Sequence, residues 1–221
     1  MGDKILRVKT GKEQKMKALL VNGSPNKEGC TFTALSEVAG ALEKNGIETE
    51  IFHIGTKPVR GCIDCRTCFK NGKCVFDDDV CNELSAKIEA ADGIVIGSPV
   101  YFAGPNGALC ALLDRAFFGA KSRFRNKAAA AIVSCRRGGA SAAFDRLNKY
   151  FTISQMPVVS SQYWNAVHGN SPDEVRRDLE GLQIMRTLGS NMAHLIKLIT
   201  AGEAPPAAEE KRYMTNFIGD K

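Results

Sequence analysis

Residues 17–54, KALLVNGSPNKEGCTFTALSEVAGALEKNGIETEIFHI, contain a short apolar run, an amphipathic segment and an alternating run in that order. The apolar run, 17–22, ends at a Gly-Ser-Pro turn, which is typical of a strand buried on both faces. Apolar residues then recur at helical spacing over 32–42, and 47–54 alternates as a second strand would. The stretch therefore predicts a β-α-β unit, because parallel strands need a crossover long enough to hold a helix.

The same alternation of strand and helix continues along the chain to residue 200. Three further apolar runs predict strands, at 93–98, 127–134 and 156–161. Segments of helical periodicity separate them, and one long amphipathic helix, capped by Ser171, is expected from 172 to 199. Five strands that alternate with helices predict an α/β fold, an open, doubly wound parallel sheet in one domain.

The 221 residues carry a formal net charge of +6, and most of the excess lies at one end. Residues 1–17 hold six lysine or arginine residues and two acidic ones, and no basic stripe with interleaved aromatics follows. We therefore expect a solvated basic arm at 1–15, a main domain at 16–200, a tail at 201–221 and no nucleic-acid partner. No apolar segment resembles a signal peptide or a membrane span, which predicts a cytoplasmic protein with no membrane partner.

Three loops that follow predicted strands are the candidate ligand sites, because ligands of such sheets bind beyond the carboxyl ends of the strands. The loop 22–33 lacks the glycine fingerprints of nucleotide sites, but its hydroxyls lead into a helix N-terminus, which suits a phosphate group. The loop 99–107 contains the aromatic pair Tyr101 and Phe102, which could flank a planar ring. The loop 134–139 adds backbone donors and two arginines, and we expect the three loops to converge on one crevice.

Four cysteines lie within GCIDCRTCFKNGKC, residues 61–74, at the spacing C-x2-C-x2-C-x5-C. Two intervening residues let successive thiolates reach neighbouring corners of a cubane cluster, whereas zinc usually takes paired knuckles with a longer spacer. A 4Fe-4S cluster is the favoured hypothesis, and zinc and metal-free thiols or a disulfide stay open. The ligands would be Cys62, Cys65, Cys68 and Cys74, while Cys30, Cys81, Cys110 and Cys135 are expected to be small buried side chains.

Two other groups of polar residues suggest structure more than chemistry. Asp77, Asp78 and Asp79 precede a helical pattern, and this position favours a helix N-terminus over a metal site. The three histidines, at 53, 168 and 194, lack metal-site spacing and an evident nucleophile partner, so we expect them to be structural.

Five segments fall in the order found in a known family: GSPNKEGCT (23–31), the cysteine stretch, DDD (77–79), ADGIVIGSPVYF (91–102) and LLDRAF (112–117). Over about residues 16–200 the chain resembles the NADPH-dependent FMN reductase-like flavodoxin-fold proteins, and its cysteine spacing resembles their iron-sulfur flavoprotein subgroup. The resemblance implies a three-layer α/β/α fold with a five-stranded parallel sheet in the order 2-1-3-4-5. It also implies bound FMN, NAD(P)H as a co-substrate and a homodimer or homotetramer.

Carried over by position, the resemblance assigns two sets of residues to FMN. The phosphate would lie on Ser24, Asn26, Cys30, Thr31 and Phe32, although relatives often have arginine at the position of Asn26 and asparagine or serine at that of Cys30. The isoalloxazine would lie against Pro99, Val100, Tyr101 and Phe102, with Cys135, Arg136, Gly138 and Gly139 nearby.

The leading functional hypothesis is an FMN-dependent oxidoreductase that moves electrons between NAD(P)H or a ferredoxin-type donor and an acceptor. No catalytic side chain is assigned, because the flavin N5 atom carries the chemistry. The first alternative is an NAD(P)H-dependent FMN or quinone reductase without a cluster. Alternatives of another class are a non-enzymatic electron carrier and a zinc-stabilised binding module.

Overall fold

A computed structural model describes residues 15–202 and residue 213, so the predicted arm and tail lie almost wholly outside the described residues. The strands are β1 (Lys17–Asn22), β2 (Glu48–His53), β3 (Gly93–Tyr101), β4 (Gly104–Pro105), β5 (Ala128–Cys135) and β6 (Ala166–His168). The helices are α1 (Cys30–Lys44), α2 (Thr67–Asn71), α3 (Cys81–Ala90), α4 (Gly107–Phe124), α5 (Ala140–Ile153), α6 (Pro172–Arg177) and α7 (Leu179–Ala201). No helix in the described part of the chain is long and apolar enough to cross a membrane.

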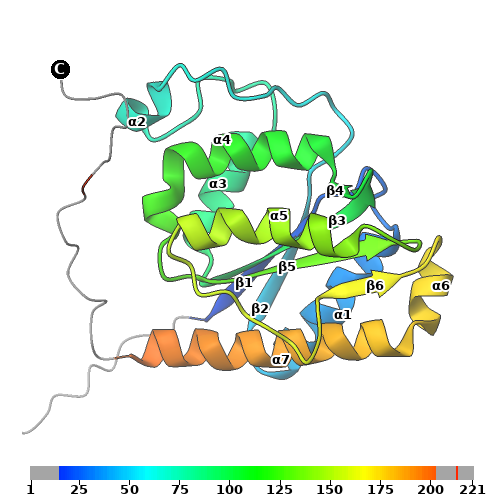
Figure 1. Cartoon of the computed structure of the whole chain (residues 1–221). Coiled ribbons are helices and arrows are strands. Elements are labelled where there is room, and N and C mark those ends of the chain that lie inside the picture. The colour runs from blue at the N-terminus through cyan, green and yellow to red at the C-terminus, as the bar shows by residue number, and fades with distance from the viewer. Residues whose placement is uncertain (1–14, 203–212, 214–221) are drawn as a thin grey trace, which may run out of the picture.

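The sheet has the predicted topology. Its parallel strands run in the order β2-β1-β3-β5-β6, which is 2-1-3-4-5 when only the parallel strands are counted. The short β4 was not predicted, and it pairs antiparallel with the end of β3. Helices α3, α4 and α5 cover one face of the sheet, and α1 and α7 cover the other (Figure 1). The fold is therefore the expected three-layer α/β/α arrangement.

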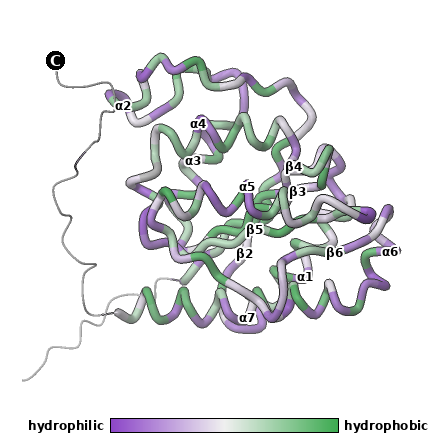
Figure 2. The backbone as a smooth tube through the Cα atoms, viewed as in Figure 1, coloured by the Kyte–Doolittle hydropathy of each residue, from purple (hydrophilic) through white to green (hydrophobic). Residues whose placement is uncertain are grey.

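Alternation along the central strands divides the hydrophobic core into two halves. In β1, Leu19 and Val21 belong to the half beneath α3, α4 and α5, while Ala18 and Leu20 belong to the half beneath α1 and α7. All four side chains are fully buried, and hydrophobic residues dominate the middle of the sheet (Figure 2). Successive side chains of a strand point to opposite faces, so a strand with helices on both sides is apolar throughout.

The predicted fifth strand, 156–161, is wrong in position. Only Val158 forms a bridge to β5, at Ala129, and regular pairing begins at β6. Between them the hydroxyl of Ser161 donates to the Asn165 side chain (2.8 Å), whose amide donates to the carbonyl of Ala131 (3.0 Å). Side-chain hydrogen bonds thus replace the backbone ladder and bend the chain away from the sheet before it returns.

The predicted helix 172–199 is divided at Asp178. Ser171 caps α6 as expected, and its side chain accepts from the N–H of Glu174 (3.3 Å). Asp178 then caps α7 by accepting from the N–H of Gly181 (2.9 Å), and it also accepts from the N–H of His168 (2.7 Å). An aspartate that bonds to backbone N–H groups outside the helical pattern starts a new helix, which hydrophobic periodicity alone does not reveal.

Two glycines test the packing of α7 on α1. A Cβ added at Gly189 would lie 2.7 Å from both the Cβ of Ala41 and the carbonyl oxygen of Val38, whereas nothing lies within 4 Å of one added at Gly40. We expect Gly189→Ala to lower the free energy of unfolding by about 1–3 kcal/mol, because the two helices must separate. Gly40→Ala should raise it by up to about 1 kcal/mol through helix propensity. Denaturant unfolding measures both, and equal effects would contradict this packing.

Candidate functional site

The loop after β1 is held in one shape by its own side chains. Ser24 donates its N–H to the side-chain oxygen of Asn22 (3.1 Å), and the Ser24 hydroxyl accepts from the N–H of Asn26 (3.1 Å). The Asn22 amide closes the loop by donating to the carbonyl of Lys27 (3.0 Å). Ser24 is almost fully buried and Asn26 is exposed, so the loop presents a fixed rim to solvent.

Helix α1 begins immediately after this loop. The N–H groups of Cys30, Thr31 and Phe32 are in its first turn, where no earlier helical carbonyl is available to them, and no acidic residue lies there. The Thr31 hydroxyl is buried and bonded to the hydroxyl of Ser134 (2.8 Å), so Thr31 offers a ligand its N–H group. Burial raises the pKa of the Cys30 thiol, which stays neutral. The first turn thus presents a cradle of backbone donors of the kind that suits an anion.

Two residues hold the loop before this cradle in place: His53, which was expected to be structural, and Asn106, which the sequence did not single out. His53, the last residue of β2, lies with its Nε2 atom 2.8 Å from the carbonyl oxygen of Ser24. Asn106 donates from its side chain to the carbonyl of Gly23 (2.9 Å) and from its N–H to the hydroxyl of Ser98 (2.9 Å). His53 ends β2 and Asn106 follows the β3–β4 hairpin, and a position at the carboxyl end of the sheet was the signal that could have identified them.

The end of β3 forms a tight hairpin with β4. Tyr101 pairs with Gly104, so Phe102 and Ala103 alone make the turn, and both have positive φ, 49° and 59°. Such two-residue turns usually contain asparagine and glycine, so this backbone is strained. The Phe102 side chain is fully exposed and Tyr101 is 46% exposed. The hairpin therefore carries two aromatic rings to the surface on a rigid support.

The third loop, after β5, packs directly on this hairpin. Gly139 has a φ of 87°, and a Cβ added to it would lie 2.8 Å from the Cα of Ala103 and 3.2 Å from Val100. The first loop joins the others, since the N–H of Gly23 donates to the carbonyl of Gly97 (2.9 Å). The structure thus brings the three predicted loops together at the carboxyl edge of the sheet.

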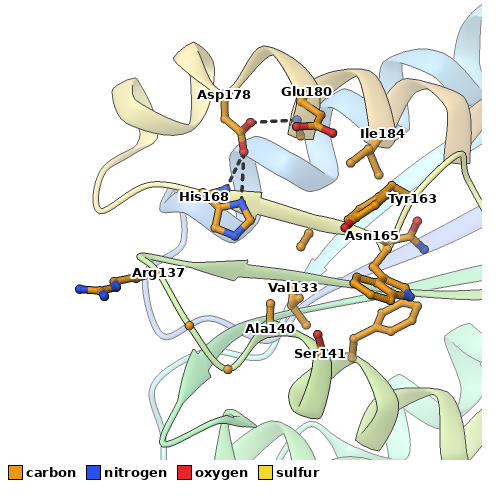
Figure 3. A pocket seen from close by; sticks show the side chains of 16 residues that line it. Val133, Arg137, Ala140, Ser141, Tyr163, Asn165, His168, Asp178, Glu180 and Ile184 are labelled. Carbon is orange, nitrogen blue, oxygen red and sulfur yellow. Dashed lines mark hydrogen bonds and ion pairs between the residues drawn. The ribbon is translucent and has the colours of Figure 1, made fainter.

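A cavity of about 410 Å³ borders the third loop (Figure 3). It lies between the N-terminus of α5, the segment 163–166 and the start of α7, and it shares Gly138 and Gly139 with the crevice. Asn165 and Ile184 line it, whereas Arg137 extends away from it (Figure 3). The cavity adjoins the three-loop crevice but is separate from the phosphate-type cradle, and sequence patterns gave no sign of it.

The four clustered cysteines line a second, smaller pocket, together with Arg115 and Phe118. Asp64 and Arg66, on either side of Cys65, have left-handed φ values of 50° and 58°, which curl the backbone around that sulfur. The Thr67 hydroxyl and N–H donate to Cys65 and lower its pKa. The lining thiols are Cys62, Cys65, Cys68 and Cys74.

One face of α4 supports this pocket at three points, spaced i, i+4, i+8. Arg115 donates through Nε to the Sγ atom of Cys74 (3.1 Å). Gly119 leaves room for Cys68, because a Cβ added at Gly119 would lie only 2.7 Å from the Cβ of Cys68. Arg123 donates to the carbonyl of Gly72 (2.9 Å). The cysteine loop is thus packed on a helix, although no motif in the sequence indicated which helix.

The aspartates before α3 have structural roles, as the sequence favoured. Asp79 accepts from the N–H of Cys81 (3.0 Å) and forms a buried ion pair with Arg115. Asp78 pairs with Arg60 (2.8 Å), and this hydrogen-bonded pair lowers the pKa of Asp78. These carboxylates therefore fix the return of the chain from the cysteine loop into α3.

The donor set of the small pocket fits an iron–sulfur cluster. Its lining contains four thiols and no carboxylate or imidazole, and all eight cysteines of the chain are unpaired. Cysteine thiolates with N–H donors at the sulfurs are the usual ligands of such clusters. Within the described residues, no three His, Cys, Asp or Glu side chains form a group that could hold a metal ion, so the fit rests on the donor set and not on the positions of the sulfurs. Cys81 is fully buried next to Cys74, and burial raises its pKa to about 12, so it stays a neutral thiol.

The two sites lie at different heights on α4. Its first residue, Gly107, follows Asn106 at the crevice, whereas Arg115 and Gly119 at the cysteine pocket come 8 and 12 residues later. At a rise of 1.5 Å per residue, the axial separation is about 12–18 Å. One rigid helix therefore fixes the distance between the crevice and the cysteine pocket.

Comparison with known proteins agrees with this geometry. Residues 16–171 match the family model described as NADPH-dependent FMN reductase. An iron-sulfur flavoprotein of Methanocaldococcus jannaschii is 35% identical over 192 residues, covering 83% of this chain and 99% of that protein. An iron-sulfur flavoprotein of Archaeoglobus fulgidus is 39% identical over 149 residues, covering 66% and 73%. The crystal structure of RosB with a bound flavin intermediate has the same fold, with a TM-score of 0.68 at 18% identity over 93% of this chain and 98% of that one.

Adjacent glycines test the junction of the hairpin and the third loop. Gly139→Ala should lower the free energy of unfolding by about 1–3 kcal/mol, because it puts a Cβ at positive φ against Ala103. Gly138→Ala should change it by less than about 0.5 kcal/mol, since nothing lies within 4 Å of an added Cβ. Denaturant unfolding compares them, and similar values for the two variants would show that the loops do not pack as described.

Proposed function

The chain belongs to the NADPH-dependent FMN reductase family and is an FMN-dependent oxidoreductase, and we propose that it holds FMN in the three-loop crevice and a 4Fe-4S cluster in the cysteine pocket. The observation that carries the proposal is that α4 links the two sites: Asn106, its N-cap, bonds to the loop that leads into the phosphate-type cradle of α1, and the four thiols lie against α4 further along. Each site has the donor chemistry of its group: backbone N–H groups for a phosphate, and thiols for iron.

In this proposal the first loop and the start of α1 hold the phosphate of FMN. The Ser24 hydroxyl hydrogen is free to donate, because its oxygen already accepts from Asn26. The phosphate oxygens would accept hydrogen bonds from this hydroxyl, from the Asn26 side chain and from the N–H groups of Cys30, Thr31 and Phe32. The absence of an acidic residue in the first turn supports this role.

The isoalloxazine ring would lie in the crevice between the hairpin and the third loop. Tyr101 and Phe102 offer exposed aromatic surface, and the strained turn keeps them in place. Gly139 allows the close approach that forms the floor of this crevice. The proposed ring contacts are Pro99, Val100, Tyr101, Phe102, Cys135, Arg136, Gly138 and Gly139.

FMN, when bound, accepts a hydride from NAD(P)H or single electrons from an iron–sulfur centre, and a protein that holds both couples two-electron and one-electron carriers. The side chains around the crevice bind and orient, and none is assigned as an acid or base. His53 and Asn106 maintain the cradle through backbone carbonyls. Burial raises the pKa of Cys135, so this thiol adds no charge next to the ring.

The surface around the cysteine pocket supports a protein partner. Ile63, Phe69 and Val75 are at least half exposed, and Phe118 stacks on Phe69 at a centroid distance of 4.9 Å. Exposed apolar side chains gathered at a functional site mark interaction surfaces. We propose a homodimer or homotetramer and a ferredoxin-type electron donor as the partners. The free thiols suit a reducing compartment, the cytoplasm.

Anaerobic purification with assays of FMN, iron and acid-labile sulfide tests the proposal. We expect bound FMN and iron, and nearly complete loss of iron with retention of FMN in Cys68→Ala, because one ligand is removed. Cys110→Ala, a half-buried cysteine outside the pocket, should keep both. Flavin with NAD(P)H oxidation but no iron would indicate the cluster-free reductase, and flavin reduced only by ferredoxin would indicate an electron carrier. Zinc without flavin would overturn the proposal.

Replacement of Ser24 tests the phosphate cradle separately from the ring site. Ser24→Ala should weaken FMN binding by about 10- to 100-fold, the range expected for one hydrogen bond to a charged group. Riboflavin has the same ring but no phosphate, and its affinity should not change. Isothermal titration of the apoprotein with each flavin measures both values. Equal weakening of the two ligands would place the phosphate elsewhere.

A further inference from the structure

Arg115 is a buried cation that contacts the sulfur of a proposed cluster ligand. Its side chain is 1% exposed, and its Nε atom lies 3.1 Å from the Sγ atom of Cys74.

Every N–H group of this guanidinium has an acceptor. Nε–H donates to Cys74, and the two terminal nitrogens donate to the carbonyls of Arg60 (3.1 Å) and Phe76 (3.3 Å) and to both carboxylate oxygens of Asp79. An arginine has five N–H donors in a fixed planar fork, and here all five are used. Arginine is not deprotonated in proteins, and a carboxylate faces this guanidinium, so the side chain stays charged.

The five acceptors lie on both sides of the cysteine loop. Arg60 directly precedes the loop, whereas Cys74, Phe76 and Asp79 lie at its end and just beyond it. One side chain from α4 therefore joins the beginning of the loop to its end. The carboxylate of Asp79 binds the two terminal nitrogens of the guanidinium. The Nε–H group is therefore left to point at the sulfur of Cys74.

We propose that Arg115 is a positioning residue that clamps the base of the cysteine loop and donates a permanent hydrogen bond to the Cys74 sulfur, which raises the reduction potential of the cluster. This part of the inference rests on the proposed function, since it needs the cluster. A reduced cluster carries more negative charge on its sulfurs, and a charge-assisted N–H donor stabilises that state more than the oxidised one. The clamp itself is independent of the cluster.

Two substitutions both remove the fork but differ in whether they keep the donor to the sulfur. In Arg115→Lys a methylene group takes the place of Nε, so the donor to the sulfur is lost while a positive charge stays near Asp79. In Arg115→Gln the side-chain amide can occupy the place of Nε, so a donor to the sulfur is kept while the fork is lost. Asp79→Asn is combined with Arg115→Gln, because a buried unpaired carboxylate would be strongly destabilising.

The matched control is Arg123→Met. Arg123 also extends from α4 to the cysteine loop, where it donates to the carbonyl of Gly72, but no hydrogen bond joins it to a described cysteine sulfur. A general loosening of the loop would therefore follow from this variant too, whereas a change in hydrogen bonding to a sulfur would not.

The first measurement is a spectroscopic redox titration of the reconstituted, FMN-containing proteins. Arg115→Lys should lower the equilibrium constant for one-electron reduction of the cluster about tenfold, which is a decrease of about 59 mV in its potential. Arg115→Gln with Asp79→Asn should lower it less, and Arg123→Met should leave it unchanged. The FMN potential, at the other site, should be the same in all four proteins. An unchanged cluster potential in Arg115→Lys, or an equal decrease in Arg123→Met, would overturn the electrostatic role.

The second measurement is hydrogen exchange of residues 60–79 in the proteins without a cluster. Arg115→Gln with Asp79→Asn should exchange at least tenfold faster than the wild type at both ends of the loop, and Arg123→Met should do so only near residue 72. If the wild-type protein takes up no iron or sulfide, the proposed function fails in its cluster, while this exchange still decides the clamp. Unchanged exchange in the double variant would overturn the clamp, and if that variant does not fold, Arg115→Lys gives the same comparison.

Discussion

The structure depends on the close approach of two strand ends, at Gly23 and Gly97. The N–H of Gly23 donates to the carbonyl of Gly97 at 2.9 Å, and a Cβ at Gly23 would lie only 2.7 Å from that oxygen. A Cβ at Gly97 would in turn meet Thr31 at 2.9 Å, at the start of α1. Any side chain at either position would separate β1 from β3 or move α1. The repeated Gly-Ser-Pro sequence is thus the point where strand order reverses and where a doubly wound sheet binds its ligand.

This constraint explains why the sequence predicted the fold and the crevice well. A strand buried on both faces, a turn and an amphipathic helix leave few arrangements, and the parallel order β2-β1-β3-β5-β6 is one of them. The crevice followed because a parallel sheet presents its carboxyl ends at one edge. The predictions were wrong where polar side chains decide the local path, as Asn165 does before β6 and Asp178 does between α6 and α7. Hydrophobic periodicity does not record such bonds.

Long-range polar contacts are the other part that the sequence did not reveal. Arg115 lies 41 positions from Cys74 and 55 from Arg60, and only the packing of α4 brings them together. Nothing in the sequence around Gly119 indicates its contact with Cys68, because that contact depends on how the cysteine loop packs on α4. In contrast, the four thiols were evident because their spacing is local. Sequence reasoning therefore singled out the four thiols that line the cysteine pocket but missed the residues that support the pocket.

The buried pair of Arg115 and Asp79 also bears on what the proposed cluster would contribute to folding. Small metal domains often fold only when the metal is bound, because their core is too small without it. Here the two halves of the core lie on the sheet, and the ion pair between Arg115 of α4 and Asp79, just before α3, anchors the cysteine loop through protein groups alone. Loss of the cluster would then remove an electron carrier and leave the crevice folded. The packing of the three loops therefore does not depend on what the cysteine loop binds.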